Sequence, residues 1–223
     1  MLSALAYKEW LKLRRVFWVP IAAAAVGLGD TLLTYRHVNE IIGPVMLWLD
    51  AVYYDKVFFS GVMFAGVFAG AWFALFQFVP ECAGNRLRLL FHLPVPHRRS
   101  VYFIAGTGLC ATAAVAGGTL LGVALIVGRY MPAEAVARAI ITCAPWMLAA
   151  LPAYMGTALV VMESSWVRRL CLGITTALFI MPLFASQVPG AYATGLPAFA
   201  AASLLWLLPL DVQAHRFKRG TRW

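Results

Sequence analysis

The longest polar-rich stretch of this chain lies between two very apolar segments, in the sequence ECAGNRLRLLFHLPVPHRRS, residues 81–100. The segment holds four arginines and two histidines, which donate hydrogen bonds to carboxylates and other anions. No H-E-x-x-H, G-x-S-x-G or G-x-x-x-x-G-K-[ST] pattern occurs anywhere in the sequence. We therefore expect ionic contact with an acidic surface here rather than catalysis, and we do not expect the chain to be an enzyme.

The composition indicates that a membrane surrounds this polar segment. Hydrophobic residues make up 62% of the chain and charged residues only 12%, against about 25% charged residues in soluble domains. Four cysteines without C-x-x-C spacing predict neither a disulfide framework nor a zinc site. We expect a polytopic membrane protein that binds no metal and no cofactor of its own.

A spanning helix needs about 20 mostly apolar residues, and six stretches approach that length. They predict an all-α fold in a single transmembrane domain, 1–223. Its parts are an interfacial helix at 1–15, spans one and two within 16–80, a loop at 81–100, spans three to six within 101–210 and a basic tail at 211–223. The predicted spans are Val16–Tyr35, Val57–Pro80, Val101–Gly128, Ala139–Met162, Leu170–Val188 and Ala193–Leu210.

The basic residues predict the orientation of these spans. With six spans both termini share one side, and that side receives fourteen of the eighteen lysines and arginines. Such a bias favours a cytoplasmic location for the basic side, so we expect a multi-pass protein of the bacterial cytoplasmic membrane with both termini inside. The net charge of +9 then faces anionic membrane lipid, and no nucleic-acid partner is needed to explain it.

Two segments flanking the first span have the periodicity of amphipathic helices. In the first, apolar residues including Trp10 share one side, and the other side carries Lys8, Lys12 and Arg15. This pattern predicts an interfacial helix with its aromatic side in the membrane and its lysines toward the headgroups. The second, 38–52, is expected outside the membrane with a bend at Gly43-Pro44.

The spans carry few polar groups at membrane depth. Asp30 and Gln77 are the candidates, and Asp30 is expected at the interface. Gly66 and Gly70 form a small-xxx-small face typical of close helix packing, as do Gly106, Gly117, Gly118 and Gly122 in span three. Pro145 and Pro152 are expected to kink span four.

The start of the basic loop has helical periodicity of its own. Glu81, Arg88 and His92 fall on one face of the predicted helix 81–93, and apolar residues line the other. Proline rings at 94 and 96 end it. A helix with one apolar and one charged face suits docking to another protein. A basic loop lying along the headgroups is the alternative, and composition alone does not separate the two.

This loop resembles the first cytoplasmic loop of six-span, exporter-type ATP-binding-cassette permeases, and the KEWLKLRR opening is similar to that family's usual start. The positions that match the loop are Glu81, Gly84, Leu89, Leu90, Leu93, Pro94 and Arg98. The resemblance implies a coupling helix that sits in a cleft of an ATPase subunit. The residues expected to contact that subunit are Glu81, Gly84, Arg86, Leu87, Arg88, Leu90, His92 and Leu93.

The resemblance also implies partners. Because the chain has no P-loop, ATP and Mg would be bound by two separate ATPase subunits, and a second copy of the chain or a similar permease would complete the path. A cytochrome c maturation-type permease is a variant of the same expectation. The alternative from another class is a membrane scaffold or assembly factor that recruits a partner through the basic loop.

Overall fold

The computed structural model describes residues 2–83, 97–186 and 188–218, with side chains described for 5–82, 99–186 and 188–213. The described residues form an all-α fold, as the sequence predicts, with turns and irregular segments between the helices. The helices are α1 (Leu2–Val16), α2 (Trp18–Ile41), α3 (Pro44–Val52), α4 (Ala65–Ala83), α6 (His97–Tyr130), α7 (Ala133–Leu148), α8 (Ala150–Met162), α9 (Trp166–Ile180), α10 (Leu196–Leu204) and α11 (Leu208–Lys218). Short 3₁₀ turns η1 (Ser60–Val62), η2 (Met181–Phe184) and η3 (Leu205–Leu207) extend three of them.

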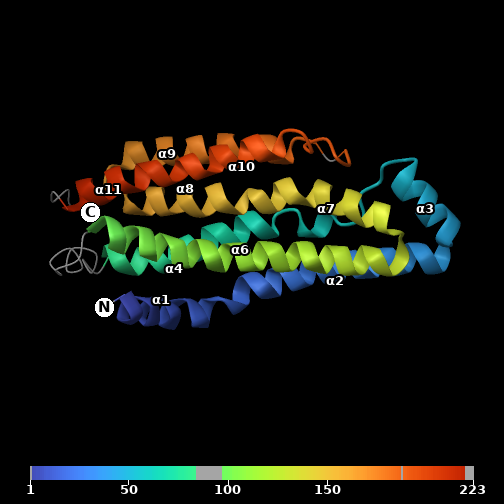
Figure 1. The fold of residues 1–223 in the computed structure, drawn as a ribbon, viewed down its shortest axis with the longest axis horizontal. Helices are drawn as coiled ribbons and strands as arrows, with labels where there is room; N and C mark the ends of the chain where they lie inside the picture. The colour runs from blue at the N-terminus through green and yellow to red at the C-terminus, as the bar shows by residue number, and fades with distance from the viewer. Residues whose placement is uncertain (1, 84–96, 187, 219–223) are drawn as a thin grey trace.

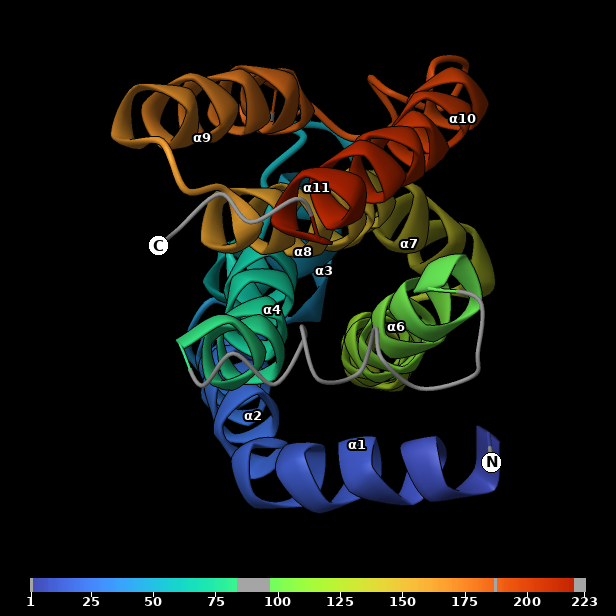
Figure 2. The same ribbon diagram turned by 90° about the vertical axis from the view of Figure 1, so that its left-hand side faces the viewer.

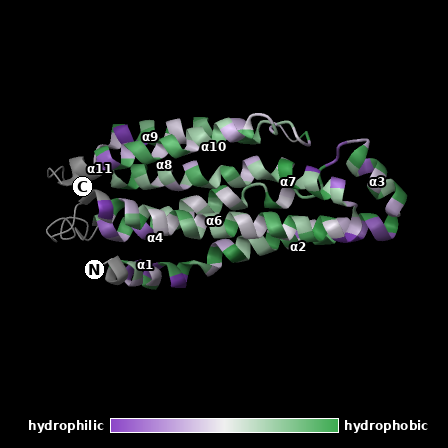
Figure 3. Cartoon of the chain, viewed as in Figure 1, coloured by the Kyte–Doolittle hydropathy of each residue, from purple (hydrophilic) through white to green (hydrophobic). Residues whose placement is uncertain are grey.

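The elongated bundle has two distinct ends (Figure 1). We call the end that holds α1 and α11 the terminal end, and the end that holds α3 the opposite end. Hydrophilic residues concentrate toward these two ends, and the middle of the bundle is mostly hydrophobic (Figure 3). This distribution is the one expected of helices that cross a hydrocarbon layer.

The prediction of six spans is confirmed. The described residues contain six helical segments long and apolar enough to cross a membrane: Trp18–Ile41, Ser60–Cys82, Arg99–Tyr130, Ala133–Met162, Trp166–Phe184 and Leu196–Gln213. The boundaries differ from the predicted ones by several residues. The first span continues through the start of the predicted outer helix and ends at Ile41 instead of Tyr35, and the fourth begins at Ala133 instead of Ala139.

The predicted bends are found where glycine and proline require them. Gly43 has a φ of 96°, which favours glycine, and Pro44 begins α3 at a position where its missing N–H costs nothing. In span four, α7 ends at Leu148 and α8 begins at Ala150. Pro145 lies in the last turn of α7, where it interrupts the regular hydrogen-bond ladder.

Helices α4 and α8 form the centre of the bundle, as the view along its long axis shows (Figure 2). Their close approach depends on glycine. A Cβ atom on Gly70 would lie 2.3 Å from the carbonyl oxygen of Ala150 in α8, and one on Gly66 would lie 2.9 Å from that of Trp146 in α7. The small face predicted for span two is therefore a helix-packing surface within this chain.

The glycines of α6 divide into two groups. Gly122 packs closely against Leu28 of α2. A Cβ atom on Gly106, Gly117 or Gly118 would meet nothing within 4 Å. The prediction that all four support close packing is therefore correct within this chain for Gly122 alone, because no described residue approaches the other three closely.

The first helix bends away from α2 at Phe17 and runs obliquely past the terminal parts of α4 and α6 (Figures 1 and 2). Pro20 explains part of this bend, because it has no N–H to donate to the carbonyl oxygen of Val16. Trp72 of α4 donates to that oxygen instead, with Nε1 at 3.1 Å. The bend therefore fixes α1 against the bundle rather than letting it continue the first span.

Candidate functional site

Glu81 lies in the last turn of α4, directly before residues 84–96, and its side chain is completely buried. Two lysines of α1 contact it. Lys8 Nζ lies 2.8 Å from Glu81 Oε1, and Lys12 Nζ forms a shorter ion pair with the same oxygen. Lys12 also lies 2.8 Å from Glu9 Oε1. These contacts tie the first helix to the point where the chain leaves span two at the terminal end.

The sequence of α1 explains this placement. Residues 8 and 12, and likewise residues 9 and 13, are four positions apart, so the four lie along one face of a helix. Leu13 on that face is buried in the main hydrophobic core, whereas Trp10 on the other face is 62% exposed. Burial of Leu13 therefore turns Lys8, Glu9 and Lys12 inward, toward α4.

Gln77 extends the contacts deeper into the bundle. It lies one turn before Glu81, and its Nε2 donates to Glu9 Oε2 at 2.8 Å and to the carbonyl oxygen of Ile104 at 2.7 Å. The hydroxyl of Tyr154 donates to Gln77 Oε1 at 2.6 Å. We call the set Lys8, Glu9, Lys12, Gln77, Glu81 and Tyr154 the Glu81 cluster; it joins α1, α4, α6 and α8.

The charges of the Glu81 cluster balance. Two lysines face two carboxylates, both of which are completely buried. A buried carboxylate is costly unless it is paired and hydrogen-bonded, so each lysine is needed by the acids around it. Glu81 Oε2 is buried too, and no described residue donates to it. The cluster is suited to positioning the segment after Glu81.

The structure corrects the predicted environment of Glu81. The sequence placed it on the exposed, charged face of the 81–93 helix, but α4 continues through it to Ala83 and turns it toward α1. The other residues predicted to contact an ATPase lie outside the described residues. They are Gly84, Arg86, Leu87, Arg88, Leu90, His92 and Leu93.

The interfacial residues of α1 are partly corrected as well. Trp10 is exposed on the outer face as predicted, and Arg15 is exposed. Lys12 was predicted to point toward headgroups, yet its side chain is only 15% exposed because it forms ion pairs with Glu9 and Glu81. The periodicity of the sequence correctly predicted a charged face on α1, but it did not predict that Glu81 is the partner of that face.

A second polar cluster lies at the terminal end, at Glu163, which directly follows the last residue of α8. The backbone N–H groups of Ser164 and Ser165 lie 3.1 and 3.3 Å from Glu163 Oε1. Burial raises the pKa of this carboxyl, but hydrogen bonds from Gln213, Ser165 and Ser164 and the charge of Arg168 outweigh it, so the pKa lies below its ordinary value. Gln213 belongs to α11, so this contact holds the C-terminal helix to the turn between α8 and α9.

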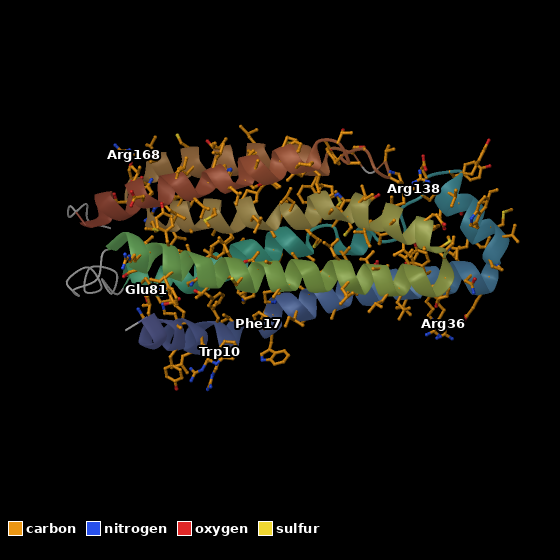
Figure 4. All side chains as sticks on the ribbon, viewed as in Figure 1. Trp10, Phe17, Arg36, Glu81, Arg138 and Arg168 are labelled. Carbon is orange, nitrogen blue, oxygen red and sulfur yellow. The ribbon has the colours of Figure 1, made fainter. Side chains whose placement is uncertain are left out.

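Figure 4 shows the ends to which these residues belong. Trp10, Glu81 and Arg168 lie at the terminal end, and Arg36 and Arg138 lie at the opposite end. Asp30, singled out by the sequence, is exposed beside Gly61 and does not join the Glu81 cluster. Among the described residues, no group of three or more His, Cys, Asp or Glu side chains has the geometry of a metal site.

The sequence reasoning named Gln77 and Glu81 but missed the roles of Glu9 and Tyr154. A signal for Glu9 was present, because an acid between two lysines is unusual on a face expected to contact anionic headgroups. No comparable signal pointed to Tyr154.

Comparison with protein-family models, with curated proteins and with solved structures found no match for this chain.

Proposed function

We propose that this chain is the membrane permease subunit of an exporter-type ATP-binding-cassette transporter. Two copies, or one copy and a similar permease, form the path for the substrate, and two separate ATPase subunits bind and hydrolyse MgATP. The observation that carries the proposal is the Glu81 cluster. It fixes the base of the basic loop between spans two and three to the first helix, at the end of the bundle where an ATPase would bind.

The orientation supports the same proposal. Both termini, the start of the basic loop and the turn after α8 lie at the terminal end (Figure 1). The sequence places fourteen of eighteen lysines and arginines in the segments that belong to this end. We propose that this end is cytoplasmic, because basic residues are retained on that side of the membrane.

The packing suggests how movement of the loop would reach the spans. Glu81 belongs to α4, and α6 begins at His97, so a displacement of the 81–93 segment acts on both helices. Gly66 and Gly70 hold α4 against α7 and α8 at backbone contact distance. Motion of α4 would therefore carry α8 with it, while the ion pairs with Lys8 and Lys12 would carry α1.

Charge reversal in the loop tests the proposed coupling. We expect Arg88→Glu to reduce retention of the ATPase subunits in the purified complex, or to uncouple ATP hydrolysis from transport, because opposed charges fix the orientation of docking partners. Insertion of the variant into the membrane should stay normal, since thirteen basic residues remain on the proposed cytoplasmic side against four on the other side.

A matched control is Arg129→Glu, which makes the same charge change at the exposed end of α6, far from the loop. We expect it to leave retention and ATP hydrolysis unchanged. Arg88→Glu with wild-type values for both quantities would refute the coupling role and favour a scaffold that recruits a partner by other residues.

A further inference from the structure

A cleft of about 590 Å³ lies between α1 and α6 at the terminal end. Its volume falls in the range of roughly 300–1,000 Å³ that is usual for pockets holding drug-sized ligands. Trp10 and Leu13 of α1, with Phe17 directly after it, form one wall, and Tyr102, Gly106 and Ala111 of α6 are among the residues of the other. The cleft adjoins the Glu81 cluster, because Leu13 lies on the α1 face that carries Lys8, Glu9 and Lys12, and the lining residue Thr107 accepts a hydrogen bond from Gln77.

The lining combines apolar walls with one cationic group. Arg14 is the charged residue among the described lining residues, and it is exposed. No described carboxylate lies within ion-pair distance of its guanidinium. Lys8 and Lys12, by contrast, are both paired on the inner face of α1. An unneutralised arginine at an apolar cleft is complementary to a ligand with an anionic group and a long apolar part.

The cleft is also open to the hydrocarbon layer. Tyr102 and Cys110 are exposed on the side of α6 that borders it, and a Cβ atom on Gly106 would meet nothing within 4 Å. A ligand can therefore enter sideways from the bilayer. Trp10 is largely exposed beside the same opening, which suits the membrane interface, where tryptophan is enriched.

We propose that this cleft binds an anionic phospholipid of the leaflet at the terminal end. An acyl chain lies against the small residues of α6, and the headgroup phosphate accepts hydrogen bonds from Arg14. This inference depends on the membrane-spanning fold and not on the proposed transport function. A failure of ATPase co-purification would leave it untouched.

Removal of the cation tests the headgroup contact. The protein, purified in a mild detergent, is titrated with phosphatidylglycerol and with phosphatidylcholine, and bound lipid is counted by native mass spectrometry. We expect one tightly bound phosphatidylglycerol per chain and about tenfold weaker binding in Arg14→Gln, because a hydrogen bond to a charged group is lost. Arg15→Gln is the control: Arg15 is also exposed but does not line the cleft. Equal effects of the two changes would overturn the proposal.

Filling the cleft tests the acyl-chain contact. Gly106→Leu places a side chain in open space within the cleft. Gly117→Leu also places a side chain in open space beside α6, but Gly117 does not line the cleft. We expect Gly106→Leu to abolish retention of phosphatidylglycerol and Gly117→Leu to keep it. Retention that survives Gly106→Leu would contradict the site. So would loss of a dimer without loss of lipid, because a second copy would then be the occupant.

Discussion

The ion pairs between α1 and α4 give the sharpest prediction for stability. Replacing Lys12 by Met removes the cation shared by Glu9 and Glu81, whose side chains are completely buried, and Lys12 itself is 15% exposed. Breaking a buried ion pair costs about 3–5 kcal/mol. Since Lys8 still contacts Glu81 and Gln77 still donates to Glu9, we expect the lower end of this range, about 3 kcal/mol.

Two variants provide a graded comparison. Lys8 is 36% exposed and contacts Glu81 alone, so Lys8→Met should cost about 1 kcal/mol. Arg15 is exposed, and Arg15→Met should change the free energy of unfolding by less than about 0.5 kcal/mol. The measurement is the free energy of unfolding in detergent by denaturant titration. An effect of Lys12→Met no larger than that of Lys8→Met would refute the buried cluster.

A double variant separates charge balance from packing. Lys12→Met combined with Glu81→Met leaves one lysine and one carboxylate, so the cluster remains neutral. Replacing a buried pair by apolar side chains is often nearly neutral for stability. We expect the double variant to recover at least half of the stability lost in Lys12→Met. A loss equal to the sum of the two single variants would show that the two side chains do not interact.

Three further predictions follow from packing, pH and orientation. Gly70→Ala should destabilise the protein by about 1–3 kcal/mol, because its Cβ would lie 2.3 Å from the carbonyl oxygen of Ala150. Gly117→Ala should be tolerated, because a Cβ there would meet nothing within 4 Å. Denaturant titration of both variants measures the difference. The pKa of Glu163 is lower in the folded protein than in the unfolded chain, so the ionised carboxylate stabilises the fold. This stabilisation is present above the ordinary pKa of 4.5 and is lost as pH falls through the pKa of the folded state. Unfolding midpoints of wild type and Glu163→Gln should therefore converge at acid pH, and a difference that is constant with pH would contradict it. A cysteine at the exposed position Val45, in a variant without the native cysteines, should react with an impermeant reagent added outside the cell; labelling only from the cytoplasm would overturn the orientation.

Hydropathy predicted the spans because a helix surrounded by lipid must be mostly apolar. Each span meets this requirement through its own residues, without help from distant parts of the chain. Glycine and proline predicted the bends at Gly43 and Pro145, since these residues act locally on the backbone. Partners distant in sequence were beyond such reasoning. The lysines of α1 matched a headgroup-facing pattern, and nothing local to them distinguishes a lipid phosphate from the carboxylate of Glu81.

The position of Glu81 illustrates the same limit. The predicted span two ended at Pro80, and the helical periodicity of the basic loop begins at Glu81 and continues to Leu93, before Pro94. Sequence alone therefore assigned Glu81 to the loop helix, although it completes a turn of α4. The glycines of α6 were read as packing positions, but composition does not say whether the partner belongs to the same chain.

We propose above all that this chain works with a separate ATPase. The decisive experiment is purification of the tagged chain from its native membrane, followed by identification and quantification of the retained proteins by mass spectrometry. We expect a stoichiometric P-loop ATPase, two copies per pair of permeases, and MgATP hydrolysis by the purified complex. A chain that is purified intact and folded from that membrane with no P-loop protein attached and no ATP hydrolysis would contradict it.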